Sequence, residues 1–166
     1  MKAITNSIII LLLAYNTASA QITKATLQVA GLTCSMCSRS VDKSLRTLDF
    51  IDSVGIDLSH ASFMLFFKKD KTVDFIQIKK KVEDAGFFVA SLKIAYKFDN
   101  LKIENNANVK FQNITFYFLN ATAKTLNGVV TFKVVDKGFV SDKEYKKYAA
   151  QLNGTMPLGT VYHVIL

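Results

Sequence analysis

The chain has 166 residues, half of them apolar, and its 21 lysines and arginines against 13 aspartates and glutamates give a formal charge of +8. This composition supports a packed core and excludes a largely disordered chain, and the length suits one average domain or two small ones. No run of lysine and arginine with interleaved aromatic residues occurs, so the composition argues against a nucleic-acid-binding protein and favours a lysine-rich surface.

The first twenty residues have the layout of a secretory signal peptide. Lys2 supplies a positive start, residues 8–13 form an unbroken apolar run, and residues 18–20 have the small-x-small pattern of a cleavage site. The apolar run is shorter than the roughly 20 apolar residues that a membrane helix needs. We therefore predict cleavage after Ala20, a periplasmic or secreted protein, and no transmembrane segment after cleavage. An uncleaved anchor segment is the alternative.

Residues 21–96 alternate between strand and helix patterns and form the first predicted domain. Six elements follow from side chains that repeat with the period of a strand or of one helix face: Ala25, Leu27 and Val29; Val41, Leu45 and Leu48; Val54, Ile56 and Leu58; residues 63–67; Phe75, Ile78 and Val82; and Phe88, Ala90, Leu92 and Ile94. Gly31 and Gly86 interrupt the pattern, and Asp74 with Gln77 has the spacing of a capping box. The order β-α-β-β-α-β predicts an α+β, ferredoxin-like domain whose antiparallel sheet has both helices on one face.

Residues 97–166 form a second predicted unit, which is small and rich in strands. Stretches rich in Asn and Asp at residues 99–100 and 105–108 predict turns, and residues 109–119 predict one long strand. The apolar positions of this strand change from odd to even numbers, so we expect a β-bulge near residues 112–113.

One helix and two more strands complete the second unit. Strands are predicted at residues 129–135, after an Asn-Gly turn, and at residues 161–165. A helix is predicted to begin at Ser141, with Glu144 in a capping box, and to end at residues 153–154. We expect a small β-rich domain with one helix, for which an OB-like barrel is one candidate. The sequence assigns this unit no function.

The two cysteines of the chain, Cys34 and Cys37, lie between the first predicted strand and the first predicted helix. A disulfide across so short a loop constrains the unfolded chain little, so a purely structural disulfide explains them poorly. Helix N-termini favour negative charge and lower the pKa of thiols, and two thiolates without a third ligand suit a soft ion. We predict that Cys34 and Cys37 bind Cu(I), or another soft ion such as Hg(II). Zinc fits less well, because it needs three or four protein ligands.

The loop around the cysteines resembles that of a known family. Residues 31–37, Gly-Leu-Thr-Cys-Ser-Met-Cys, are similar to the Gly-Met-Thr-Cys-x-x-Cys loop of heavy-metal-associated domains, and residues 82–87 resemble the end of that family's second helix. The resemblance covers residues 23–96 and implies a ferredoxin-like fold that binds Cu(I) or another soft metal at the two cysteines. The family includes copper chaperones and an exported periplasmic mercury-binding protein, which suits the predicted signal peptide.

The resemblance also implies roles for three neighbours of the cysteines. Leu32 stands where the family usually has Met, and we expect it to pack beneath the loop, since the exchange nearly conserves volume. Thr33 precedes the first cysteine as in the family, and Phe87 occupies the loop position that in the family faces the metal. We expect Leu in place of Met to affect binding little and Phe87 to help tune the site, and we expect none of the three residues to bind the metal.

The alternative function is that of a thiol–disulfide redox protein that uses the same cysteine pair. Against it, the chain has no tryptophan and its single proline is Pro157. No arrangement of catalytic residues is visible, so we predict a metal-binding protein that is not an enzyme, with a metal-accepting or metal-donating protein as partner. Met36 as an accessory ligand, and a second copper site at Met156 and His163, are weaker candidates, because nothing else soft is close to them in sequence.

Overall fold

The computed structural model of the chain describes residues 22–104, 106–152 and 161–166. The predicted signal peptide at residues 1–20, the helix end at residues 153–154 and the candidate ligand Met156 lie outside these residues. In the described part of the chain, no helix has the length and apolar character that crossing a membrane requires.

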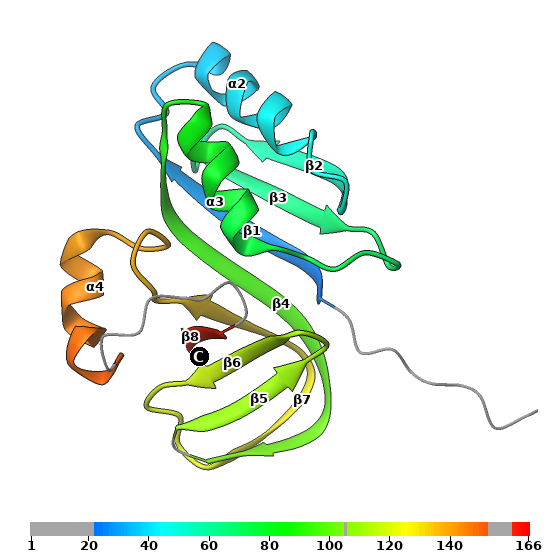
Figure 1. Ribbon diagram of the computed structural model, residues 1–166, viewed down its shortest axis with the longest axis vertical. Coiled ribbons are helices and arrows are strands. Elements are labelled where there is room, and N and C mark those ends of the chain that lie inside the picture. Colours follow the sequence, from blue (N-terminus) through cyan, green and yellow to red (C-terminus); the bar gives the residue numbers. More distant parts are fainter. Residues whose placement is uncertain (1–21, 105, 153–160) are drawn as a thin grey trace, which may run out of the picture.

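The first half of the molecule has the predicted β-α-β-β-α-β order. Its elements are β1 (Ile22–Ala30), α2 (Ser35–Leu45), β2 (Ile51–Asp57), β3 (Ser62–Phe67), α3 (Phe75–Asp84) and β4 (Phe88–Ile103). The strands run in the order β2-β3-β1-β4 with antiparallel neighbours, and α2 and α3 lie together on one face of this sheet (Figure 1). The ferredoxin-like arrangement predicted for this half is confirmed.

Helix α3 begins and ends as the sequence predicts. The carboxylate of Asp74 accepts hydrogen bonds from the backbone N–H groups of Ile76 and Gln77, at 2.9 and 3.1 Å. The side chain of Gln77 also donates to Asp74. Gly86 follows the helix at a φ of +87°, a conformation that costs glycine little. The residues predicted to face the core are buried: Phe75, Ile78 and Val82.

The start of β4 differs from the predicted alternation. Its register against β1 shifts so that Ala90 has no partner, which makes a β-bulge. As a result Val89 and Ser91 are buried, whereas Phe88, which the sequence pattern placed in the core, is 69% exposed.

The second half continues the same sheet. Its elements are β5 (Ala107–Phe111), β6 (Ile114–Phe118), β7 (Lys124–Val134), α4 (Asp142–Tyr148), the short 3-10 helix η1 (Ala149–Gln151) and β8 (Val161–Ile165). From β4 onward the strand order is β4-β7-β8-β6-β5, with β8 parallel to β6 and the other pairs antiparallel.

The single bulged strand predicted at residues 109–119 is wrong. The segment forms β5 and β6, which are joined by a two-residue turn at Gln112 and Asn113, with Gln112 at a φ of +54°. Phe111 pairs with Ile114 across this turn, and paired residues share a face of the sheet. The turn therefore explains why the apolar positions change from odd to even.

The turn predicted at residues 99–100 is a bulge inside β4. The register of β4 against β7 shifts between Phe98 and Leu101, and Asn100 has a φ of +46°. Gly128, which was predicted to precede the next strand, lies within β7 opposite Phe98 at a φ of +70°. These irregularities bend both strands, and the long β4–β7 ribbon curves around the core of the second half (Figure 1).

The predicted helix of the second half is present, without a complete capping box. Ser141 Oγ accepts a hydrogen bond from the backbone N–H of Glu144 at 3.3 Å. The carboxylate of Glu144 does not return a bond to Ser141, because it pairs with Lys133 of β7 at 2.6 Å. Helix α4 is thereby held against the sheet by an ion pair.

One hydrophobic core joins the two halves. Phe75 of α3 contacts the rings of Phe116 and Tyr162 in the second half, with centroids 6.4 and 5.3 Å apart. The boundary predicted between residues 96 and 97 falls inside β4, and the division into two domains stays a prediction. Among the described strands β5 pairs with β6 alone, so the sheet is open and an OB-like barrel is not established.

Candidate metal centre

The two cysteines lie where β1 passes into α2, as the sequence predicts. Cys34 is the N-cap residue of α2 and Cys37 is in its first turn, with Cα atoms 5.3 Å apart. The backbone N–H of Cys37 donates to Cys34 Sγ at 3.1 Å, and a disulfide joins the two sulfurs. Metal binding therefore requires that the pair be reduced first, because the thiolate is the form that binds metal.

The cysteine loop is accessible from solvent. Cys34 is exposed, Cys37 is half-buried, and Met36 between them is 67% exposed. The first turn of α2 contains no acidic residue. The positive end of the helix dipole thus acts on the sulfurs without an opposing carboxylate in that turn, which favours the thiolate form after reduction.

The segment before Cys34 is supported by the core. Gly31 has a φ of +86°, and a Cβ at this position would lie 3.7 Å from Cδ1 of Phe87. Leu32 and Phe87 are partly buried and pack against the core, whereas Thr33 is exposed. Leu32 thus packs as expected and the Phe87 ring lies beside the loop. An effect of Leu32, Thr33 or Phe87 on metal binding stays a prediction.

Two other segments lie at the same end of the sheet as the cysteine loop. The backbone N–H of Val29 donates to the carbonyl of Ala61 at 3.1 Å, which holds the β2–β3 turn beside the end of β1. Phe88 pairs with the last residue of β1. Leu58 in the turn is 61% exposed and Phe88 is 69% exposed, and with Met36 they are three exposed apolar residues at this end of the sheet, which we call the apolar tip. The sequence pattern missed this tip because it placed Leu58 and Phe88 at strand positions.

The histidines lie in other settings. His60 Nδ1 lies 2.7 Å from Asp57 Oδ2 in the β2–β3 turn, and hydrogen bonds from Ser59 and His60 lower the pKa of Asp57 to about 2. His163 is buried in the second half, with Nδ1 2.7 Å from Asp136 Oδ1. Over residues 22–104, 106–152 and 161–166, no three His, Cys, Asp or Glu side chains are grouped so that they hold a metal ion.

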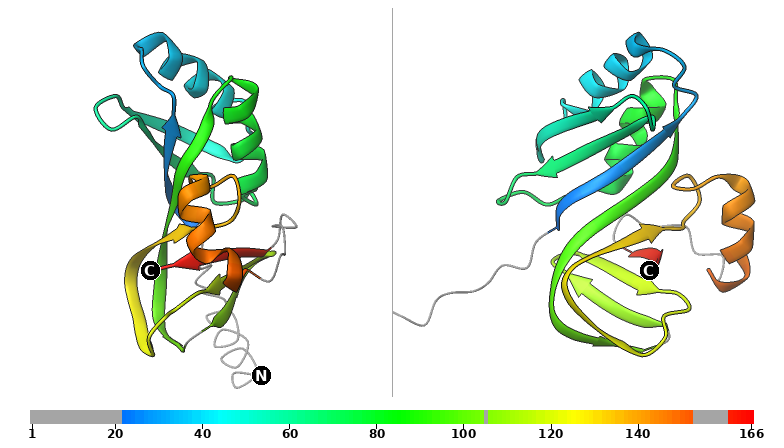
Figure 2. Two further views of the ribbon diagram at one scale, coloured as in Figure 1. Left: turned by 90° about the vertical axis from the view of Figure 1, so that its left-hand side faces the viewer. Right: turned by 180° about the vertical axis from the view of Figure 1, so that it is seen from behind.

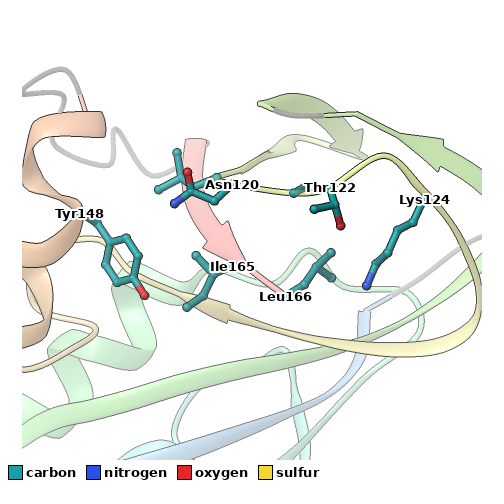
Figure 3. Close-up of a pocket in the computed structure, with 8 residues that line it drawn as sticks. Asn120, Thr122, Lys124, Tyr148, Ile165 and Leu166 are labelled. Carbon is teal, nitrogen blue, oxygen red and sulfur yellow. The ribbon is translucent and has the colours of Figure 1, made fainter.

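A pocket of about 370 Å³ lies in the second half (Figure 3). Its lining includes the buried side chains of Leu119 and Ala121 and the polar side chains of Asn120, Lys124 and Tyr148. The pocket contains neither cysteine, so it contributes nothing to the candidate metal centre.

Comparison with known proteins gives relatives for part of the chain. Residues 26–88 match the family described as the heavy-metal-associated domain. Copper chaperone CopZ of Staphylococcus saprophyticus is 33% identical over 64 residues, which are 39% of this chain and 93% of the chaperone. Probable copper-transporting ATPase HMA5 of Arabidopsis thaliana is 35% identical over 105 residues, which are 63% of this chain and 9% of the ATPase.

Among solved structures, oxidized MerP from Ralstonia metallidurans CH34 is 27% identical, with a TM-score of 0.37, and the match covers 40% of this chain and 92% of that one. This chain spans only 9% of the length of the copper ATPases that it matches. By contrast, it covers nearly the whole of CopZ. The family match over residues 26–88 includes both cysteines, and the chain is 33% identical to CopZ over 93% of CopZ. The chain therefore belongs to the heavy-metal-associated domain family.

Proposed function

We propose that the protein is an exported carrier of a soft metal ion, and that Cu(I) binds between the sulfurs of Cys34 and Cys37 after the disulfide is reduced. The observation that carries this proposal is the direct contact of the two sulfurs at the N-terminus of α2. Two thiolates suit a soft ion that accepts two ligands. The copper named for CopZ and for the related ATPases supports Cu(I) over other soft ions.

We propose further that a partner protein supplies or receives the metal through a thiolate of its own. The incoming thiolate binds the two-coordinate ion, and one cysteine sulfur of this chain then leaves it. Cys34 is exposed, and the apolar tip of Met36, Leu58 and Phe88 offers such a partner exposed apolar surface at the same end of the sheet as the loop. The chain acts here as a binder and carrier, with no catalytic role.

The test is competition for Cu(I) between the fully reduced protein and a chromophoric Cu(I) chelator, under anaerobic conditions. The reduced protein is expected to take up one Cu(I) per chain. The double variant C34S/C37S should fail to compete. The matched control M36L changes the exposed residue between the cysteines and should bind as the parent does. Equal binding by C34S/C37S and the parent would exclude this site.

The export of the protein rests on residues 1–20 of the sequence. Intact mass spectrometry of the protein from its native host is expected to show a chain that begins at Gln21, recovered outside the cytoplasm. A cytoplasmic protein that keeps residues 1–20 would contradict a periplasmic or secreted location.

A thiol–disulfide redox protein is the second candidate, because the structure holds Cys34 and Cys37 as a disulfide beside an accessible surface. The two functions differ in what the same pair does. A redox protein reduces or oxidises disulfides of a substrate protein with turnover, whereas a carrier holds Cu(I) against the chelator. Turnover of a disulfide substrate without competitive Cu(I) binding would establish the redox function.

A further inference from the structure

Three neighbouring strands of the sheet and most of a fourth contain no acidic residue. β3, β1, β7 and residues 88–98 of β4 include none of the 13 aspartates and glutamates of the chain. The same strands contain these lysines: Lys24, Lys93, Lys97, Lys124 and Lys133. Positive charge on this part of the sheet is therefore not balanced within the strands themselves.

The strand register places four of these lysines on one face, because Lys133 of β7 is the cross-strand partner of Lys93. Cross-strand partners share a face, and so do alternate residues of a strand. Lys24 pairs with Ala95 on one side and with Phe66 on the other, so it lies on the same face as Lys93 and Lys97. We call this the basic face, made up of Lys24, Met64, Phe66, Lys93, Lys97, Val129 and Lys133.

No helix of the first half covers the basic face. Helices α2 and α3 lie on the opposite face, and in the view from behind the strands stand in front of them (Figure 2). Lys93 and Lys97 are exposed and take part in no ion pair within the part of the chain that the structure describes. Lys24 Nζ lies 5.9 Å from the centre of the Phe66 ring. Val129 is 71% exposed and Phe66 37%.

The arrangement of charge on this face costs stability. Lys93 is directly opposite Lys133, and like charges in such positions destabilise a sheet. Glu144 of α4 pairs with Lys133 at 2.6 Å and offsets one of the two charges. Lys93 forms no ion pair of its own among the described residues, so an anionic partner would relieve the remaining repulsion.

We propose that the basic face docks on an anionic phospholipid bilayer. Lysine is depleted in protein–protein interfaces, whereas lysine clusters bind anionic lipid surfaces. Met64, Phe66 and Val129 lie among the lysines, and partly exposed apolar side chains can enter the interfacial region of a bilayer. The cysteine loop follows the last residue of β1 and is not part of this face, so docking leaves the cysteines accessible. This inference does not depend on the proposed metal.

The test is sedimentation of the full chain with vesicles of phosphatidylcholine, alone or mixed with phosphatidylglycerol. The triple variant K24Q/K93Q/K97Q removes the three charges of the basic face that form no ion pair among the described residues, and leaves Lys133, which Glu144 offsets. The control K110Q/K143Q/K147Q removes three exposed lysines from β5 and α4 and has the same net charge. We expect binding only to the anionic vesicles, weakened by high salt and reduced about a hundredfold in the face variant, with the control close to the parent.

Two controls show whether the face variant loses binding through its charge or through misfolding. Far-UV circular dichroism should be the same for all proteins, and K24R/K93R/K97R, which keeps the charge, should restore binding. Equal losses in the face and control variants would overturn the proposal, since net charge alone would then explain binding. Equal binding to neutral vesicles would overturn it too. Binding of the protein to poly-glutamate, with no binding to any vesicle, would also overturn it. The apolar residues 8–13 are the same in every variant and cannot account for a difference between them.

Discussion

Tyr162 of β8 packs edge-on against Phe75, the first residue of α3, with ring centroids 5.3 Å apart and ring planes at 84°. Phe116 of β6 lies 6.4 Å from the same ring. All three side chains are buried. Helix α3 ends shortly before Phe87, whose ring lies beside the cysteine loop. The first residue of α3 is thus anchored in the core of the second half.

Replacement of Phe75 by Ala should destabilise both halves together. Loss of a buried phenylalanine lowers the free energy of unfolding by about 3–5 kcal/mol. We expect one urea transition, seen alike by tyrosine fluorescence and by amide NMR signals of α2, since every tyrosine in the described residues lies at position 96 or later. The exposed Phe88 is the matched control, and F88A should change stability by no more than about 0.5 kcal/mol. Separate transitions for the two reporters would show that the halves fold independently.

Cys34 has two roles that substitution can separate. Its sulfur caps α2 by accepting the N–H of Cys37, and it is a proposed metal ligand. Under reducing conditions C34S keeps a cap acceptor and should unfold like the parent, whereas C34A should lose about 1 kcal/mol of stability. Both should lose Cu(I) binding. C37A keeps the cap formed by Cys34, so it should lose Cu(I) binding and keep the stability of the parent. Urea unfolding and chelator competition measure the two effects, and equal stability of C34A and C34S would show that the cap contributes nothing.

The first half was predictable because its signals are local. Alternation in β1, the one-faced pattern of α3 and the Asp74 cap all lie within short windows of sequence, and so do the two cysteines. Few sheet topologies are compatible with the order β-α-β-β-α-β of these elements. The place of the two cysteines between the first strand and the first helix follows from the same local pattern, whereas the cap formed by Cys34 is seen only in the structure.

The second half was predicted less well because its shape depends on pairing between distant segments. The pattern at residues 99–100 reads as a turn, yet pairing with β7 carries β4 straight through it as a bulge. The exposure of Phe88 depends in the same way on the register of β4 against β1. The disulfide is a redox state, which spacing alone does not fix. The packing of Phe75 against Tyr162 joins residues 87 positions apart, and no periodicity within either element encodes it.

The pKa of Asp57 should depend more on Ser59 than on His60. The Ser59 hydroxyl donates to Asp57 Oδ1 at 2.6 Å and, ahead of His60, lowers the pKa of this carboxyl from 3.8 to about 2. Because the folded-state pKa is lowered, the stabilisation is present above about pH 4 and is lost as the pH falls through about 2. Carboxyl ¹³C NMR titration should show a larger rise of the Asp57 pKa in S59A than in H60A. An unchanged pKa in S59A would contradict this hydrogen bond.

Replacement by alanine should change the free energy of unfolding in opposite directions at the buried Ser91 and the partly buried Ser44. Ser91 Oγ is buried and has no hydrogen-bond partner among the described residues, so S91A removes an unsatisfied polar group and should raise the free energy of unfolding by about 1 kcal/mol. Ser44 Oγ donates to the carbonyl of Lys81 at 2.8 Å and links α2 to α3, so S44A should lower it by about 1 kcal/mol. Urea unfolding of both variants beside the parent measures the two changes. If S91A is destabilised as much as S44A, the Ser91 hydroxyl has a partner in solution, and a buried water is then the natural one.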